Sequence, residues 1–212
     1  MFRSVFKPYG LVWTILNHVT DVLFLSLLWC LCSLPILTMG AATTALYDAV
    51  AHGMRRGEGG MYRRFFRTFR AELKLSCCVM LMWAPALLFC GFVLTLLTAA
   101  GAESTAAALL SGAYRLIMLV PIGAMCWSLI ILSRLTYGFR ALTATAFQFL
   151  LHDPLPSAAI AAVGWVGIWF CTDNLLPFTF VPALIALAWS FLAEPVFGKL
   201  GAGLTGEAAE GE

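Results

Sequence analysis

Long apolar stretches alternate with short polar connections along this chain of 212 residues. Five stretches approach or exceed the roughly 17 to 25 residues that an α-helix needs to cross the hydrocarbon core of a bilayer. They lie at 22–47, 75–97, 116–133, 155–172 and 174–193. Because lipid cannot satisfy backbone hydrogen bonds, such segments are expected to be helical. The pattern predicts an all-α fold, a polytopic bundle of about five transmembrane spans within one domain covering residues 1–200.

Proline occurs well inside four of the five predicted spans, whereas in the span 155–172 it stands only at the second residue. The residues are Pro35, Pro85, Pro121 and, in the last span, Pro177 and Pro182. A proline within a helix removes one backbone hydrogen bond and bends the helix. The freed carbonyls then need partners from neighbouring helices or hydroxyl groups. We therefore expect kinked spans that pack against one another.

Two polar segments beside the spans have helical periodicity. Residues 6–19 place apolar side chains on one side, as in a helix that lies in the membrane interface. In residues 61–75 the apolar and polar faces are separated more clearly. The apolar face is formed by Tyr62, Phe66, Phe69 and Leu73, and arginines lie around it. This segment follows a glycine-rich turn at 57–60, which ends the preceding helix. We expect both segments to be amphipathic interfacial helices.

Seven of the 13 Lys and Arg residues lie between residues 55 and 74, in the connection between the first two predicted spans. They are Arg55, Arg56, Arg63, Arg64, Arg67, Arg70 and Lys74. Basic residues next to spans resist translocation, so loops of this kind stay in the cytosol. The pattern predicts a cytosolic basic loop at 48–74. Alternation of the spans then places the C-terminus inside too, with an acidic tail at 201–212 that we expect to be disordered.

The side on which the N-terminus lies depends on the number of crossings. Five crossings put it outside, where its basic residues fit poorly. Six crossings, with the first two at 11–33 and 36–54, would put both termini inside. This alternative buries Asn17, His18 and Asp21, and the aspartate alone costs about 2.5 to 3.5 kcal/mol at a helix centre. We therefore favour five spans and keep six as the alternative.

The composition excludes an ordinary water-soluble domain. The chain is 61% hydrophobic and 11% charged, against roughly 45 to 50% and about 25% in soluble proteins. Its mean hydropathy is +0.90. A formal charge of +2, with the basic residues beside spans, gives no reason to expect nucleic-acid binding. The lipid bilayer is the first partner that the composition implies.

Neither a metal site nor a catalytic site is indicated. All seven cysteines lie in apolar runs without the CxxC spacing of zinc or redox sites, and no histidine stands within five residues of one. The turn at 57–60 lacks the Lys-Ser/Thr that completes a phosphate-binding loop. No Ser, His and Asp arrangement and no paired intramembrane acids are present. We therefore predict no catalytic residues, no metal, no cofactor and no enzymatic activity.

Ionisable residues in or beside spans are costly and are therefore functional candidates. The candidates are Asp21, Arg115, Asp173 and Glu194, together with Thr38 and Gly40 within the first span. Arg115 could pair with Glu103 or Asp173 at the outer face. The alternative is that all four charged residues lie at the interface, where snorkelling or a local ion pair satisfies them. Thr38 and Gly40 mark either a hinge or, as we favour, close helix packing.

One motif is specific enough to suggest a family. Residues 33–47 read SLPILTMGAATTALY, and residues 65–70 read FFRTFR. With these motifs the chain resembles the YesL family of small bacterial integral membrane proteins, formerly grouped as a domain of unknown function. The resemblance extends over about 11–200. One departure is the Ala-Glu-Leu sequence at 71–73, where the family often has an Asn-Phe pair.

The resemblance implies a non-catalytic accessory protein of the bacterial cytoplasmic (inner) membrane. Family members are often encoded beside carbohydrate uptake genes, notably those of ABC transporters, so ABC permease subunits are the expected partners. Small residues at four-residue spacing, such as Ala41 and Ala45, leave a homo-oligomer open. The alternative is a small stand-alone transporter or channel, with Arg115 or Asp21 lining its path.

The amphipathic segment supplies the predicted contact surface. Its residues are Tyr62, Arg63, Arg64, Phe66, Arg67, Phe69 and Arg70. Aromatic side chains amid arginines suit either a protein partner or anionic lipid. The alternative is that the arginines only hold the loop inside while the aromatic face lies on lipid.

Overall fold

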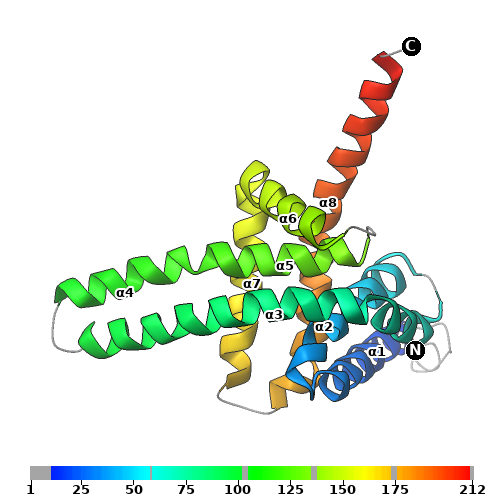
Figure 1. Ribbon diagram of the computed structural model, residues 1–212. Coiled ribbons are helices and arrows are strands. Elements are labelled where there is room, and N and C mark those ends of the chain that lie inside the picture. The colour runs from blue at the N-terminus through cyan, green and yellow to red at the C-terminus, as the bar shows by residue number, and fades with distance from the viewer. Residues whose placement is uncertain (1–10, 58, 102–104, 135–137, 173–175, 211–212) are drawn as a thin grey trace.

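The fold is known from a computed structural model that describes residues 11–57, 59–101, 105–134, 138–172 and 176–210. Over these residues the regular elements are helices, with no strand, which confirms the predicted all-α class. The elements are α1 (Leu11–Cys32), η2 (Ile36–Thr38), α2 (Met39–Val50), η3 (Ala51–Arg55), α3 (Met61–Gly101), α4 (Thr105–Ile117), α5 (Leu119–Leu132), α6 (Phe139–His152), α7 (Pro154–Thr172), η4 (Leu176–Thr179) and α8 (Val181–Glu210) (Figure 1).

Several helices are long and apolar enough to cross a membrane. By length and composition, three stretches of the described residues qualify: 61–101, 105–132 and 181–198. Helices α6 and α7 form a further apolar pair, bent by 109° at a short break, which would make four if it is a single broken span. This agrees with a polytopic helical membrane protein, although it gives fewer uninterrupted crossings than the predicted five.

The predicted first span, 22–47, is two helices instead of one kinked helix. Helix α1 ends at Cys32, and α2 begins at Met39 after a 3-10 turn. Pro35 causes the break, because it lacks an N–H group and disfavours helical geometry in the residue before it. The Thr38 hydroxyl lies 2.7 Å from the Cys32 carbonyl and 2.8 Å from the Pro35 carbonyl, to which it donates. Helix α2 has 12 residues and runs directly into the π-helix η3, so this helical segment extends from Met39 to Arg55.

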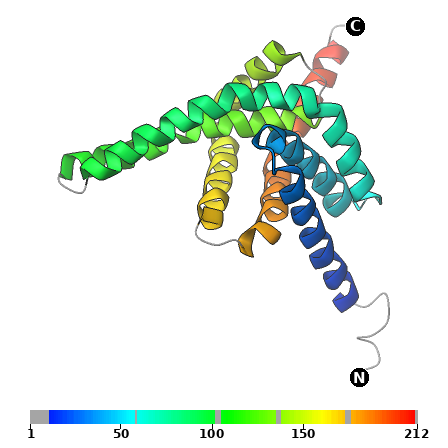
Figure 2. The same ribbon diagram turned by 60° about the horizontal axis from the view of Figure 1, so that its bottom comes forward.

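The amphipathic segment predicted at 61–75 and the span predicted at 75–97 form the single helix α3. This helix has 41 residues and continues through Pro85. Its length is about 60 Å, twice the hydrocarbon thickness of a bilayer. In Figure 2 the first turns of α3, in teal, are inclined to the long green part. The first turns therefore follow a different direction from the apolar span.

The last two predicted spans, 155–172 and 174–193, and the predicted tail, 201–212, also differ from the prediction. Helix α7 starts at Pro154, and α8 has Pro182 at its second residue, positions near a helix start that proline tolerates well. Helix α8 then continues to Glu210, so the tail predicted to be disordered at 201–212 is helical as far as it is described. Extending an existing helix costs little compared with nucleating one, although the glycines at 198, 201, 203 and 206 do not favour the extension.

Helix α5 lies at the centre of the larger core. Ten of its 14 residues are buried, and it packs against α3, α6 and α7. The Trp127 ring stacks on Phe149 at 5.0 Å between ring centroids, and Phe197 of α8 meets the Trp127 ring edge to face at 6.1 Å. A second core joins α1, α2, the start of α3 and α8 through Leu25, Phe65 and other residues.

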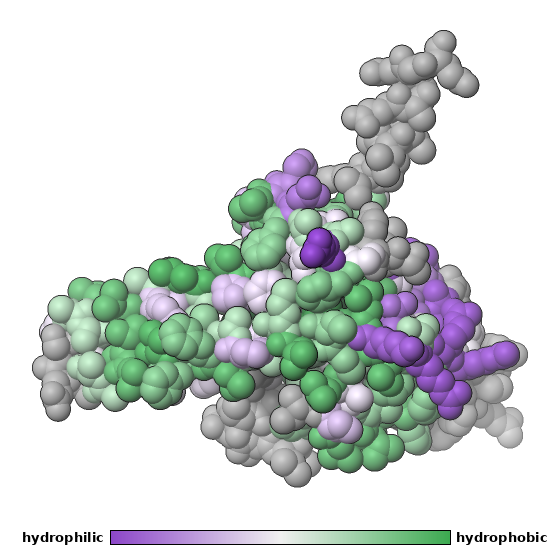
Figure 3. Space-filling model, in the orientation of Figure 1, coloured by the Kyte–Doolittle hydropathy of each residue, from purple (hydrophilic) through white to green (hydrophobic). Residues whose placement is uncertain are grey.

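Beyond this core, α3 and α4 continue side by side as an arm (Figures 1 and 2). Large apolar side chains cover the arm: Leu88 is 74% exposed and Leu109 is 73% exposed. Figure 3 shows the arm as almost continuously hydrophobic, whereas hydrophilic side chains gather where α3 begins. Such an arm requires an apolar environment, which a bilayer provides.

Candidate functional site

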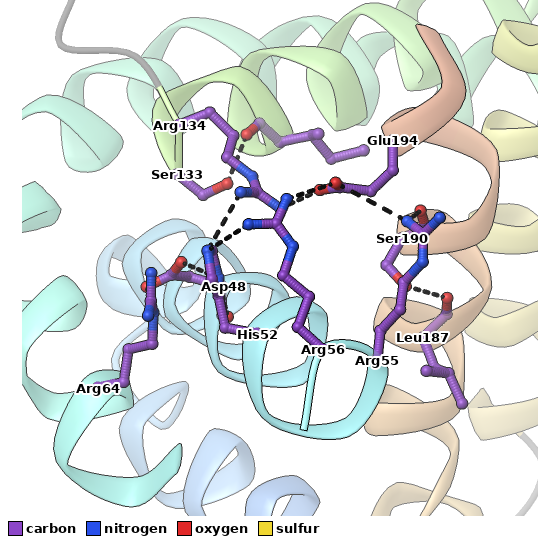
Figure 4. Close-up of polar contacts among 11 residues, drawn as sticks. Asp48, His52, Arg55, Arg56, Arg64, Ser133, Arg134, Leu187, Ser190 and Glu194 are labelled. Carbon is purple, nitrogen blue, oxygen red and sulfur yellow. Dashed lines mark hydrogen bonds and ion pairs between the residues drawn. The ribbon is translucent and has the colours of Figure 1, made fainter. Parts of the chain in front are cut away.

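Charged and polar residues from four parts of the chain meet in one place (Figure 4). We call this group the arginine–carboxylate cluster. It comprises Asp48, His52, Arg55, Arg56, Arg64, Thr68, Arg134, Ser190 and Glu194. The end of α2 with η3, the start of α3, the turn that follows α5 and the middle of α8 each contribute. The cluster therefore lies where these four segments converge.

One half of the cluster is built around Glu194. Its carboxylate accepts hydrogen bonds from Arg134 and, at 2.9 Å, from Arg56. The Arg55 guanidinium lies 3.9 Å from the same carboxylate and donates to the Ser190 carbonyl at 2.6 Å. The Glu194 side chain is only 13% exposed. Three cations around one shielded carboxylate tie η3 and α5 to α8.

The other half is built around Asp48, which is 4% exposed. Its Oδ2 atom accepts hydrogen bonds from Arg64 Nε at 3.0 Å and from the Thr68 hydroxyl at 2.7 Å. These two donors are four residues apart and so share one face of α3. His52 Nδ1 lies 3.0 Å from Asp48 Oδ1. This half joins α2 to the start of α3.

His52 links the two halves. Its Nε2 atom is 3.2 Å from an Arg134 nitrogen and 3.4 Å from an Arg56 nitrogen. Because a guanidinium group can only donate, Nε2 must accept, which places the ring proton on Nδ1 facing Asp48. The four guanidinium groups of the cluster then face two carboxylates, so these residues carry two positive charges in excess.

The cluster resembles a structural junction more than a reaction centre. Its carboxylates are bound by arginines, and the ring nitrogens of His52 both have partners. In the part of the chain that the structure describes, no three His, Cys, Asp or Glu side chains come together as metal ligands would. Breaking such a shielded network is costly, because each partner would be left as an unpaired charge.

Of the residues predicted from the sequence, Glu194 and Arg64 belong to the cluster. Asp21 and Tyr62 meet elsewhere: the Tyr62 hydroxyl donates to Asp21 Oδ1 at 2.9 Å. The Tyr62 ring also contacts Phe24 edge to face, with 6.5 Å between ring centroids. This contact fastens α1 to the start of α3.

Helix α3 turns a different face toward the bundle than the predicted contact surface assumed. Phe65 is fully buried, and Phe69 stacks on it and packs against the smaller core. Phe66 is 42% exposed, as predicted for a contact residue. Arg63, Arg67 and Arg70 are exposed as well. Phe69 is therefore a packing residue, because the helix turns its Phe65 face toward the bundle.

The other candidates lie apart from the cluster. Gly40 is buried, and a Cβ atom there would lie 2.6 Å from Met80 Cγ, so it marks close packing of α2 on α3. The Thr38 hydroxyl donates hydrogen bonds to backbone carbonyls at the break before α2. Arg115 is exposed on α4. Asp173 and Glu103 lie outside the described residues, so their pairing with Arg115 stays a prediction.

Sequence reasoning did not select seven of the nine cluster members as candidate site residues: Asp48, His52, Arg55, Arg56, Thr68, Arg134 and Ser190. A signal for the first two was present, since an acid and a histidine four residues apart follow directly on an apolar helix. Arg134 gave no comparable signal, because a single arginine after a span is common.

Comparison with protein-family models gives a match over part of the chain. Residues 22–96 match a family model described as "Protein of unknown function, DUF624". The matched region runs from α1 through most of α3 and contains Asp48, His52 and Arg64. No curated protein and no solved structure matches significantly.

Proposed function

We propose that this protein is a non-catalytic accessory protein of the bacterial cytoplasmic (inner) membrane, similar to the YesL family, that binds a carbohydrate ABC importer. The motif at 33–47 and the match over 22–96 to a family of unknown function support the family assignment. The proposed partners are the permease subunits of the importer.

The observation that carries the proposal is that both carboxylates of the arginine–carboxylate cluster are already paired with arginines. A transporter or an enzyme needs polar groups directed at a substrate. Here Asp48 and Glu194 are each held by arginines from other helices. The polar interior therefore supports a role in holding the helices in place, which suits a binding protein.

The proposed contact surface is the exposed side of the start of α3. Tyr62 is 40% exposed and Phe66 is 42% exposed, with Arg70 exposed one turn further on. The opposite side of the same turns is fixed by the ion pair of Arg64 with Asp48. A surface held rigid before binding loses less entropy when a partner docks.

The test is copurification from native membranes in mild detergent. We expect permease or ATPase subunits of an importer to accompany the wild-type chain. The double substitution Phe66→Ala and Arg70→Ala should reduce their recovery severalfold, because both side chains lie on the contact surface. Phe170→Ala, which removes an aromatic ring that is 52% exposed on α7, should not. Recovery of the chain alone, with sugar uptake unchanged after deletion of the gene, would contradict the proposal.

The cytosolic position of the contact surface has its own test. In a chain without native cysteines, we expect Gly59→Cys to react with a membrane-impermeant thiol reagent only after the cells are opened. Thr105→Cys, at the far end of the α3–α4 arm, should react in intact cells. Labelling of Gly59→Cys in intact cells would show that the orientation is reversed.

A stand-alone transporter remains the alternative because of two features. The 109° bend between α6 and α7 is of the kind found in broken transporter helices. A cavity of about 640 Å³ also opens between α1 and α8, lined mainly by apolar side chains with Arg55 and His18 among them. Solute uptake by the purified chain alone in liposomes would favour this function over the accessory one.

A further inference from the structure

A second cavity, of about 470 Å³, opens at the start of α3. It is lined by Gly59, Gly60, Arg63, Arg64 and Arg67. We propose that this cavity binds the phosphate group of an anionic phospholipid. The proposal does not depend on the ABC importer, since it concerns a lipid and rests mainly on the cavity and its arginines.

The two glycines leave the backbone side of the cavity open. A Cβ atom added at either one would meet no heavy atom within 4 Å. Gly60 has a φ of +84°, a conformation that side chains other than glycine rarely adopt. Its carbonyl accepts the Arg64 amide at 3.0 Å, so the first turn of α3 starts here. The free amide groups of that turn add a partial positive charge beside the cavity.

The three arginines have different roles. The Arg64 guanidinium is anchored by Asp48, which fixes the inner side of the cavity. Arg63 and Arg67 are four residues apart on one exposed face of α3. No carboxylate of the described residues lies within ion-pair distance of either guanidinium. As far as the described residues go, the cavity therefore presents two guanidinium groups without a carboxylate partner, and their fork of donors matches a phosphate.

The surroundings favour a lipid phosphate over a soluble one. Exposed Tyr62 and Phe66 lie on the turns that carry Arg63 and Arg67, a combination typical of side chains at a membrane surface. The same helix continues into the apolar stretch that qualifies as a membrane span. Figure 3 shows this hydrophilic region directly beside hydrophobic surface. A lipid bound here could place its headgroup on the arginines and its chains on the apolar side chains.

The experiment titrates the delipidated full-length protein in neutral detergent with dioctanoyl phosphatidylglycerol and follows the complex by native mass spectrometry. Dioctanoyl phosphatidylcholine and inorganic phosphate are titrated in parallel. We expect phosphatidylglycerol to bind most tightly. The double substitution Arg63→Gln and Arg67→Gln should weaken it about tenfold or more, since two charge-assisted phosphate contacts are lost.

The matched control is Arg70→Gln with Lys74→Gln, which removes the same charge from exposed positions of the same helix outside the cavity. We expect its affinity for phosphatidylglycerol to stay within about threefold of wild type. Equal weakening in both variants would overturn the site, because general electrostatic attraction would then suffice. Equal affinity for inorganic phosphate and phosphatidylglycerol would overturn the lipid assignment. Thermal unfolding of both variants checks that each is folded.

Discussion

Replacing Glu194 by glutamine tests whether the arginine–carboxylate cluster holds the bundle together. The substitution keeps the size of the side chain and removes its negative charge. Arg55, Arg56 and Arg134 would then face one another around a neutral amide. We expect a large loss of stability, because these guanidinium groups would lose the anion that compensates them.

The magnitude follows from how far each partner is shielded from water. Removing one member of a buried ion pair typically costs about 3 to 5 kcal/mol, whereas exposed pairs contribute about 0.2 to 1 kcal/mol. The Arg134 side chain is 16% exposed, and that of Arg56 is 46% exposed. Arg134 should therefore account for most of the loss. Because glutamine retains one acceptor oxygen, we expect Glu194→Gln to lower the free energy of unfolding by about 3 kcal/mol.

The assay is equilibrium unfolding in detergent micelles, followed by helical circular dichroism. The matched control is Asp153→Asn, which removes the carboxylate from the pair with His152, whose side chain is 86% exposed. Asparagine can also replace aspartate at the start of α7. We expect this control to change the unfolding free energy by less than about 1 kcal/mol.

Double-mutant cycles separate the two arginines. The coupling energy between Glu194 and Arg134 should be about 2 kcal/mol, and that between Glu194 and Arg56 should be below about 1 kcal/mol, in line with their exposure. If Glu194→Gln unfolds at the wild-type denaturant concentration, or if the exposed Arg56 shows the larger coupling, the reasoning from burial is refuted.

Two further substitutions test helix packing away from the arginine–carboxylate cluster. Gly40→Ala should lower the free energy of unfolding by about 1 to 3 kcal/mol, because the new Cβ would collide with Met80 Cγ. The control is Gly112→Ala, whose Cβ would meet open space; it should be neutral or stabilising in the same unfolding assay. Ser157→Ala removes the acceptor of the buried Trp127 indole N–H, which lies 2.9 Å from the hydroxyl, so it should cost about 1 to 3 kcal/mol; an unchanged unfolding midpoint would mean that another group accepts this bond.

Much of the fold class was predictable because the local sequence decides it. Continuous apolar stretches predict helices in lipid wherever they occur, and the structure is all helical with several long apolar helices. The period of aromatic and basic residues after Met61 likewise predicted the start of α3. The sequence did not show which face of the first turns of α3 packs against the bundle. Phe65 and Phe66 are equally apolar, and only the neighbouring helices distinguish them.

The break after α1 shows a local signal whose outcome depends on its surroundings. Pro35 was visible as an interruption, and proline either kinks a helix or ends it. The helix ends here, and the Thr38 hydroxyl and the packing of Gly40 against α3 stabilise the resulting turn. Those contacts depend partly on residues outside the segment, which its own sequence cannot show.

The hydrophobic pattern by itself determined that this chain is a helical membrane protein and where its basic segment begins, because both follow from the transfer of short segments between water and lipid. Only the tertiary structure decided which charges meet. Glu194 pairs with Arg134 across 60 residues and with Arg56 across 138. Whether two charges so far apart in the sequence meet is decided by how the helices pack. The sequence around one partner therefore does not identify the other.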